Sequence, residues 1–161
     1  MMLEKLNNEL LEFLDDVEVI KTSNDELLVI YEEVLSIISI KDNMYHVYIE
    51  TKEKDSYITK VLVENELSND ESEVRFFIYE ANTLASAYKM ISDLKDFKLE
   101  SINNYNMNFT FKNLKVVAYT CYEELDVTIT RLDTNEILEE DYIIYHKELE
   151  EVLYECLEKT M

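Results

Sequence analysis

The sequence predicts an α+β fold with three helices and a mainly antiparallel sheet. Apolar residues at three- and four-residue spacing mark helices near both ends and near the middle of the chain. Between them lie runs of β-branched and aromatic residues, separated by short polar breaks that are typical of antiparallel strands. A chain of 161 residues is expected to form a single domain, residues 1–161, and to bury a core without a metal or a disulfide.

The first helix is expected over residues 3–15, where leucines recur along one face: Leu3, Leu6, Leu10, Leu11 and Leu14. Six strand-like runs follow, at residues 17–20, 27–31, 34–40, 45–49, 57–63 and 74–79. Asp, Asn, Ser and Lys fill the breaks between them, as expected where these residues take the place of glycine in turns. Ser23 and Glu26 could instead form a capping box that opens a short helix, although we favour a strand.

A second helix is expected from Asn82 or Thr83 to residue 94, with Leu84, Tyr88 and Ile91 on its inner side. Strand-like runs resume at residues 97–102, 107–111, 114–121, 125–132 and 137–145. The last helix is expected over residues 146–159, where apolar residues form a stripe: Leu149, Val152, Leu153, Cys156 and Leu157.

The two blocks of strands resemble each other weakly when one is shifted by 80 residues. Asp16 then matches Asp96, and Val29 matches Phe109. This pattern predicts either an internal repeat with halves 1–81 and 82–161, or two unrelated blocks that share helix-then-strand patterning. A true repeat would form a pseudo-twofold molecule with one continuous sheet.

The chain is strongly acidic, with 15 Lys and Arg against 36 Asp and Glu and a net charge of −21. Because 47% of the residues are hydrophobic, we expect a folded protein rather than a disordered acidic tail. The charge argues against direct binding to nucleic acid or to anionic membranes. Cys121 and Cys156 are expected to be free thiols in a reducing compartment. The N-terminus lacks the features of a signal peptide, so we expect a cytoplasmic protein, in the host cytoplasm if it is phage-encoded.

The sequence contains no glycine and no proline, which excludes the usual forms of the P-loop, the Rossmann fingerprint and the nucleophile elbow. His46 and His146 are expected to be surface or hydrogen-bonded residues. Asp42, Glu50 and Lys52 have a nuclease-like spacing, but such a pattern is common by chance in this composition. We therefore expect no catalytic residues, metal or cofactor.

Acidic residues gather in three segments, which we expect to bind a partner. Residues 132–158 hold ten acidic residues and one lysine, so their balance is 1 − 10 = −9, whereas residues 89–115 have a balance of +2. The predicted partner-binding residues are Glu9, Glu12 and Asp16 near the N-terminus, Glu64, Glu66, Asp70, Glu71 and Glu73 in a central loop, and Glu139, Glu140, Asp141, Glu148, Glu151, Glu155 and Glu158 near the C-terminus.

The last helix carries a row of carboxylates at Glu148, Glu151, Glu155 and Glu158, beside its apolar stripe. Residues at this spacing lie about 5–6 Å apart at Cβ, so such a row can imitate the phosphates of a nucleic acid. A solvated helix face is the alternative interpretation of the same row.

With its small size and acidic segments, the chain resembles the nucleic-acid-mimic inhibitors carried by phages and mobile elements, of the anti-CRISPR and anti-restriction type. The resemblance implies a non-enzymatic inhibitor that binds the basic nucleic-acid channel of an effector nuclease and blocks nucleic-acid binding. One alternative is an immunity protein or a secretion-type chaperone that binds one cationic protein client. A metal-dependent nuclease that uses Asp42, Glu50 and Lys52 is a third hypothesis.

Overall fold

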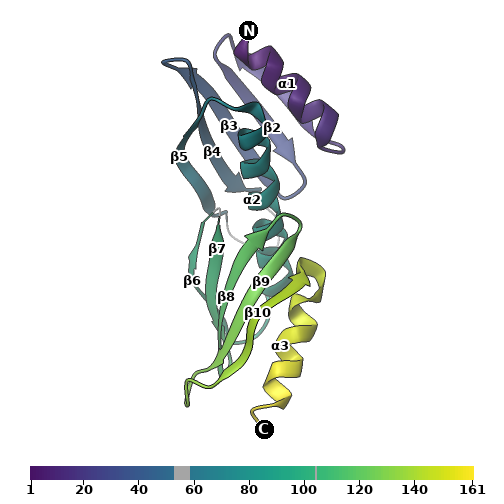
Figure 1. Cartoon of the computed structure of the whole chain (residues 1–161), viewed down its shortest axis with the longest axis vertical. Coiled ribbons are helices and arrows are strands. Elements are labelled where there is room, and N and C mark those ends of the chain that lie inside the picture. Colours follow the sequence, from purple (N-terminus) through teal and green to yellow (C-terminus); the bar gives the residue numbers. More distant parts are fainter. Residues whose placement is uncertain (53–58, 104) are drawn as a thin grey trace.

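The computed structural model of the chain describes residues 1–52, 59–103 and 105–161. Over these residues it has three α-helices and two five-stranded antiparallel sheets (Figure 1), so the predicted α+β class is confirmed. The first part comprises α1 (Met2–Phe13), β1 (Glu18–Ser23), β2 (Glu26–Tyr31), β3 (Val34–Lys41), β4 (Met44–Thr51) and β5 (Val61–Ser68). The second comprises α2 (Glu71–Ile91), β6 (Phe97–Ile102), β7 (Asn106–Phe111), β8 (Leu114–Cys121), β9 (Glu124–Arg131), β10 (Ile137–Tyr145), a short 3₁₀ turn η1 (His146–Glu148) and α3 (Leu149–Glu158).

Each sheet is a simple meander, with strand orders β1-β2-β3-β4-β5 and β10-β9-β8-β7-β6. The bounds of β2, β3 and β4 become those of β7, β8 and β9 when 80 is added. Backbone turns repeat at the same interval, because positive φ angles occur at Asp16 and Asp96, at Glu32 and Lys112, and at Asp42 and Tyr122. A left-handed backbone at Glu, Lys or Tyr is uncommon, so these matched turns show that the two halves share one backbone plan.

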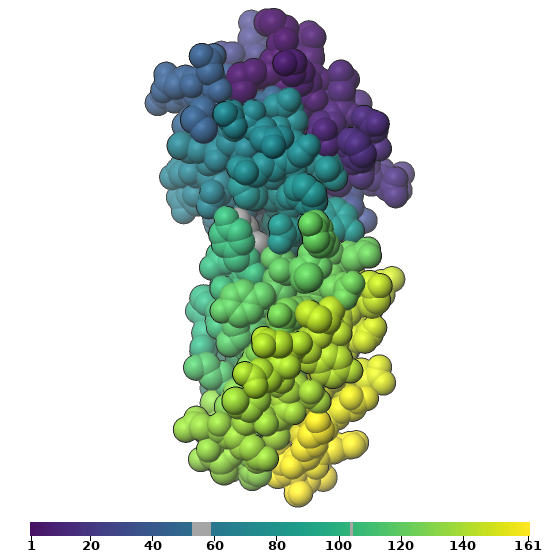
Figure 2. Space-filling model, in the orientation of Figure 1, coloured from purple at the N-terminus to yellow at the C-terminus, as the bar shows by residue number. Residues whose placement is uncertain are grey.

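The two halves lie end to end along the long axis of the molecule, with the N-terminal residues at one end and the C-terminal residues at the other (Figure 2). Helix α2 joins them. Val74, Ile78, Ala81 and Ala85 pack into the buried cluster under the first sheet, whereas residues in the second half of the helix, among them Leu84, pack under the second sheet. One helix therefore contributes to both cores.

Two expectations about the middle of the chain are wrong. Residues 74–79 form part of a helix rather than a strand, and that helix begins at Glu71 rather than at residue 82 or 83. The apolar residues of this β-branched and aromatic run also have helical spacing. They form one face of α2, which packs against both sheets. The one continuous sheet that a true repeat would form is not seen, because no ladder joins the two described sheets. The division between residues 81 and 82 falls within α2.

Most other elements agree with the sequence analysis. The five later strands and the last helix occupy the expected segments, and Ser23 and Glu26 belong to paired strands rather than to a capping box. The strand expected over residues 57–63 starts outside the described residues, and β5 begins at Val61. In the described part of the chain, no helix is both long enough and apolar enough to cross a membrane.

Candidate partner-binding surfaces

Helix α3 separates an apolar face from an acidic one. Its residues Leu149, Val152, Leu153 and Cys156 are buried in the cluster under the second sheet. Carboxylates lie on the opposite side, and the structure exposes all four that were predicted to form a row: Glu148, Glu151, Glu155 and Glu158. None of these four makes a hydrogen bond or an ion pair with a described residue. The row therefore exists and faces solvent, and its carboxylates make no hydrogen bond or ion pair with a described residue.

An open depression runs along this acidic face. It is lined by Lys147, Glu150, Glu151, Tyr154, Glu155 and Glu158. Tyr154 is 43% exposed, and its ring meets that of Phe111 edge to face, with ring centroids 5.7 Å apart. The surface therefore combines several carboxylates, one amine and the polar end of a tyrosine.

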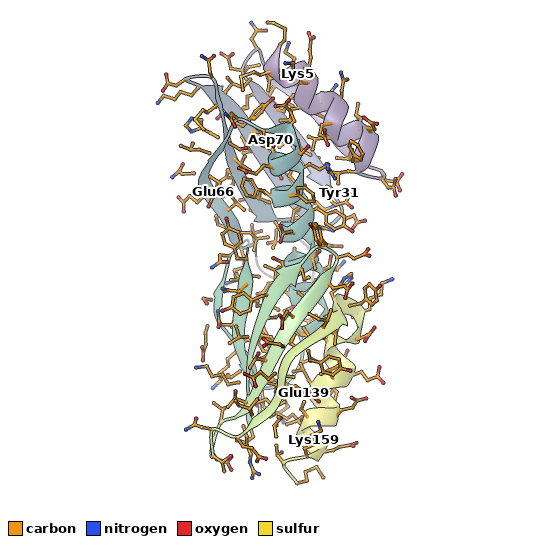
Figure 3. The ribbon with its side chains drawn as sticks, in the orientation of Figure 1. Lys5, Tyr31, Glu66, Asp70, Glu139 and Lys159 are labelled. Carbon is orange, nitrogen blue, oxygen red and sulfur yellow. The ribbon has the colours of Figure 1, made fainter. Side chains whose placement is uncertain are left out.

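Strand β10 is the edge strand of the second sheet and packs beside α3. Glu139 accepts a hydrogen bond from Lys159 Nζ at 2.8 Å, so this carboxylate is already paired (Figure 3). Glu140 and Asp141 are exposed, and the strand bulges here, with a positive φ at Asp141. We call Glu140, Asp141 and the four carboxylates of the row the C-terminal acidic surface.

The N-terminal acidic residues do not form a comparable surface. Glu9 Oε2 lies 2.7 Å from Arg75 Nε, and the Arg75 guanidinium also stacks on the Phe13 ring at 4.4 Å. This pair fastens α1 to α2, so Glu9 has a structural role. Glu12 is exposed near the end of α1, and Asp16 is exposed in the following turn.

The central acidic segment is not the predicted loop. Glu64 and Glu66 belong to β5, whereas Glu71 and Glu73 begin α2. Asp70 is the N-cap of that helix, and its carboxylate accepts a hydrogen bond from Ser72 N at 2.9 Å. Burial is the main cause that raises the pKa of Tyr45, and Glu71 adds to the effect. Two of these five acidic residues therefore interact with other parts of the fold: the exposed Asp70 caps α2, and the partly buried Glu71 interacts with Tyr45.

A groove at the junction of the two halves was not predicted. Its volume is about 580 Å³, and its lining residues are Glu66, Glu73, Phe76, Phe77, Glu80, Tyr105, Thr120, Cys121 and Tyr122. Tyr105 and Tyr122 are 50% and 62% exposed. Phe76 meets Tyr122 edge to face, with centroids 5.7 Å apart, and Thr120 Oγ1 donates to Glu80 at 2.8 Å. Aromatic rings and carboxylates thus line it, without any lysine or arginine among the described residues.

The sequence analysis missed this groove because three distant segments build it. β5 and α2 form one side, whereas the β6–β7 and β8–β9 turns form the other. The one signal in the sequence was an aromatic residue placed inside each of two polar turns, at Tyr105 and Tyr122.

The candidate nuclease residues are not assembled. Asp42 lies in the turn before β4, and Glu50 lies near the far end of that strand. At about 3.3 Å per residue, these eight positions span about 26 Å. Glu50 also accepts a hydrogen bond from Tyr48 Oη at 2.7 Å. No group of three or more His, Cys, Asp or Glu side chains in the described chain could hold a metal ion.

The histidines and cysteines lie apart. His46 is on β4, and His146 begins η1 with its Nδ1 atom buried and without a hydrogen-bond partner among the described residues. Burial lowers the pKa of His146. Both cysteines are free, Cys121 exposed in the junction groove and Cys156 buried under the second sheet.

Comparison of the chain with protein-family models, with curated proteins and with solved structures finds no match. The assignment of function therefore depends on the surfaces themselves.

Proposed function

We propose that this protein is a non-enzymatic inhibitor that binds the basic nucleic-acid channel of an effector nuclease through its C-terminal acidic surface. The observation that supports the proposal is the exposed row of Glu148, Glu151, Glu155 and Glu158, which has no internal partner in the described chain. Glu140 and Asp141 are two further exposed carboxylates, on the neighbouring strand β10. The proposal places the protein in the cytoplasm, where such channels are accessible.

The row does not stabilise the helix that carries it. Like charges at i, i+4 destabilise a helix by about 0.2–0.5 kcal/mol per pair, and Glu151 with Glu155 is such a pair. α3 has no basic residue in its last turn, so Glu155 and Glu158 also lie at the negative end of the helix dipole, and Lys159 at the C-cap offsets part of this repulsion. A surface that binds cations accounts for carboxylates that cost stability.

Electrostatics predicts how this binding behaves. A net charge of −21 steers a cationic channel toward the protein and accelerates association at low salt. Salt screens such exposed charges, with a Debye length of about 8 Å at physiological ionic strength. Binding should therefore weaken steeply as salt rises, and nucleic acid should compete for the same channel.

The test begins with capture of partners from cell lysate by the immobilised protein, followed by identification and purification of each captured protein. Affinity is then measured at low and high salt, with and without duplex DNA or guide RNA as competitor. The triple variant Glu151→Gln, Glu155→Gln and Glu158→Gln should bind at least about tenfold more weakly, because the charged contacts are lost.

The matched control is Glu4→Gln, Glu12→Gln and Glu64→Gln, three exposed residues of the first half. Both variants have a net charge of −21 + 3 = −18. If the two lose affinity equally, only overall charge matters, and the C-terminal surface is not the binding site. A complex that tolerates high salt, or one in which nucleic acid and the protein bind together, would also contradict the proposal.

A second candidate function is binding of one cationic protein client, as an immunity protein or secretion-type chaperone does. The junction groove favours it, because Phe76, Tyr105 and Tyr122 lie beside the carboxylates of Glu66 and Glu73, a combination that suits an arginine or lysine with apolar neighbours. Nucleic acid would not displace such a client. Blocking Cys121 with a bulky thiol reagent should abolish client binding, whereas Cys156 is buried and should not react.

A further inference from the structure

The first sheet has an apolar outer face, on the side away from α1 and α2. Alternate residues of its strands point to opposite sides. Those that point toward the helices, such as Val29 and Val34, are fully buried. Five of those that point outward are apolar as well, and neither buried cluster includes them: Leu28, Ile30, Leu35, Ile37 and Tyr48. Apolar side chains on both faces are unusual for an antiparallel sheet that is covered on one face.

Strand register places these outward side chains together. In one row Ile20 pairs with Leu28, Leu28 with Ile37, and Ile37 with Tyr48. In the next row Ile30 pairs with Leu35. Three further outward residues at the margins are clearly exposed: Ile20 at 39%, Val61 at 43% and Leu67 at 48%. The outer face is therefore a contiguous apolar patch rather than scattered single residues.

The second sheet shows that this fold does not require an apolar outer face. Adding 80 to Leu28, Ile30, Leu35 and Tyr48 gives Asn108, Thr110, Lys115 and Thr128. Those residues occupy the same places in the same register. Four of the five apolar positions are thus polar on the second sheet, where only Ile37 has an apolar counterpart, Val117, so the apolar set on the first sheet needs another explanation.

The charges around the patch indicate what kind of surface could cover it. Glu18 and Glu50 lie at the two ends of the row that contains Ile30 and Leu35. Glu26 borders the other side, and Lys41 is the one lysine or arginine that points outward from the described strands of the first sheet. A second copy would bring acidic margins together and add another −21, so repulsion disfavours it. A partner with basic margins is complementary.

We propose that the outer face of the first sheet docks an apolar surface of a partner protein whose border carries lysine or arginine. Burial of Leu28, Ile30, Leu35, Ile37 and Tyr48 supplies the affinity, and Glu18, Glu26 and Glu50 orient the partner through charge. This docking site is separate from the C-terminal acidic surface and does not rest on nucleic-acid mimicry.

The test uses two dye-labelled peptides of equal length and charge, one alternating Lys with Leu and the other alternating Lys with Ser. Fluorescence anisotropy measures their affinities for the full chain. The Lys–Leu peptide should bind at least about tenfold more tightly, because burying one large apolar side chain corresponds to about that factor or more. This preference should persist at high salt, which weakens only the charged part of the interaction.

The variant L28N/I30T/Y48T replaces outward residues with those of the second sheet and leaves the net charge at −21. It should lose the preference for the Lys–Leu peptide while its circular dichroism stays unchanged. Leu28→Asn alone should reduce the preference if the triple variant folds poorly. Val117→Thr on the outer face of the second sheet is the matched control and should bind as the wild type does. The variant E151Q/E155Q/E158Q should keep the preference, which separates this site from the C-terminal surface.

Three results would overturn the inference. The first is equal binding of both peptides by the wild type. The second is an undiminished Lys–Leu preference in folded L28N/I30T/Y48T. The third is a stable dimer in sedimentation that L28N/I30T/Y48T converts to a monomer, because the occupant of the face would then be a second copy of the chain.

Discussion

The two sheets share their strand order, the register of their three central strands and the geometry of three turns, yet their outer faces differ in chemistry. Inward positions are apolar in both, as at Ile49 and Ile129, which correspond and are both fully buried. Outward positions change from Leu28 and Ile30 in the first sheet to Asn108 and Thr110 in the second. The comparison separates what the fold requires, an apolar inner face, from what each half presents to partners.

The largest effect should come from the inner faces, where the two halves are alike. Ile49→Ala and Ile129→Ala should each lower the free energy of unfolding by about 2–5 kcal/mol, because each leaves a cavity in a fully packed cluster. Urea unfolding followed by circular dichroism measures both. If residues 1–161 form a single domain joined by α2, each variant shifts one common transition. A biphasic curve in which each substitution shifts a different phase would show two independent units instead.

The shared helix α2 should be the next most sensitive element. Asp70→Ala removes the only side-chain N-cap found among the described α-helices, and should cost about 1 kcal/mol. Asp70→Asn keeps a capping acceptor and serves as the control. Thermal unfolding of both variants checks this expectation. Equal loss of stability in the two variants would mean that the charge at position 70 matters rather than the cap.

Exchange of outward residues should change stability less than the core substitutions do. L28N/I30T/Y48T, and the reciprocal N108L/T110I/T128Y, should each change stability by less than about 1 kcal/mol per site, which is the range of strand preferences in a host sheet. Urea unfolding provides the values. A loss as large as that of Ile49→Ala would mean that the first sheet needs its apolar outer face to fold, and the comparison between the sheets would fail.

The smallest effect should be a dependence on pH at the junction of the halves. Burial, followed by Lys147, lowers the pKa of His146, and Glu32 opposes this. The unfolded chain therefore binds this proton at a higher pH than the folded chain does, and stability present at neutral pH is lost as the pH falls below about 6.5. We expect the free energy of unfolding to fall by less than about 1 kcal/mol by pH 5.5.

His146→Gln should remove this part of the pH dependence, measured as the melting temperature at pH 7.5 and pH 5.5. His46→Gln, on the outer side of β4, is the control and should leave the pH dependence unchanged. If His46→Gln flattens the profile instead, the half-buried His146 is not its source.

Most of the fold could be predicted from the sequence, because each short strand has its own apolar run between polar turns. The helix around Val74 and Ile78 could not be predicted, because the β-branched residues there are compatible with a strand as well as with a helix. The helix is favoured by packing of its apolar face against both sheets, which the local sequence does not reveal. The acidic row on α3 followed from local spacing. The roles of Glu9 and Glu139 did not, because their partners Arg75 and Lys159 lie on other elements.

The surfaces between distant segments were the least predictable. The junction groove depends on turns that meet α2 only in the folded chain. The outer face of the first sheet becomes evident only when register shows which apolar residues point away from the helices.

The most direct measurement of the difference between the halves is the affinity of the Lys–Leu peptide for the reciprocal pair of variants. L28N/I30T/Y48T should lose the preference over the Lys–Ser peptide, and N108L/T110I/T128Y, made on the second sheet, should gain a second site with such a preference. The contradicting result is that folded L28N/I30T/Y48T keeps the preference and folded N108L/T110I/T128Y gains no second site. Outward side chains would then not determine binding.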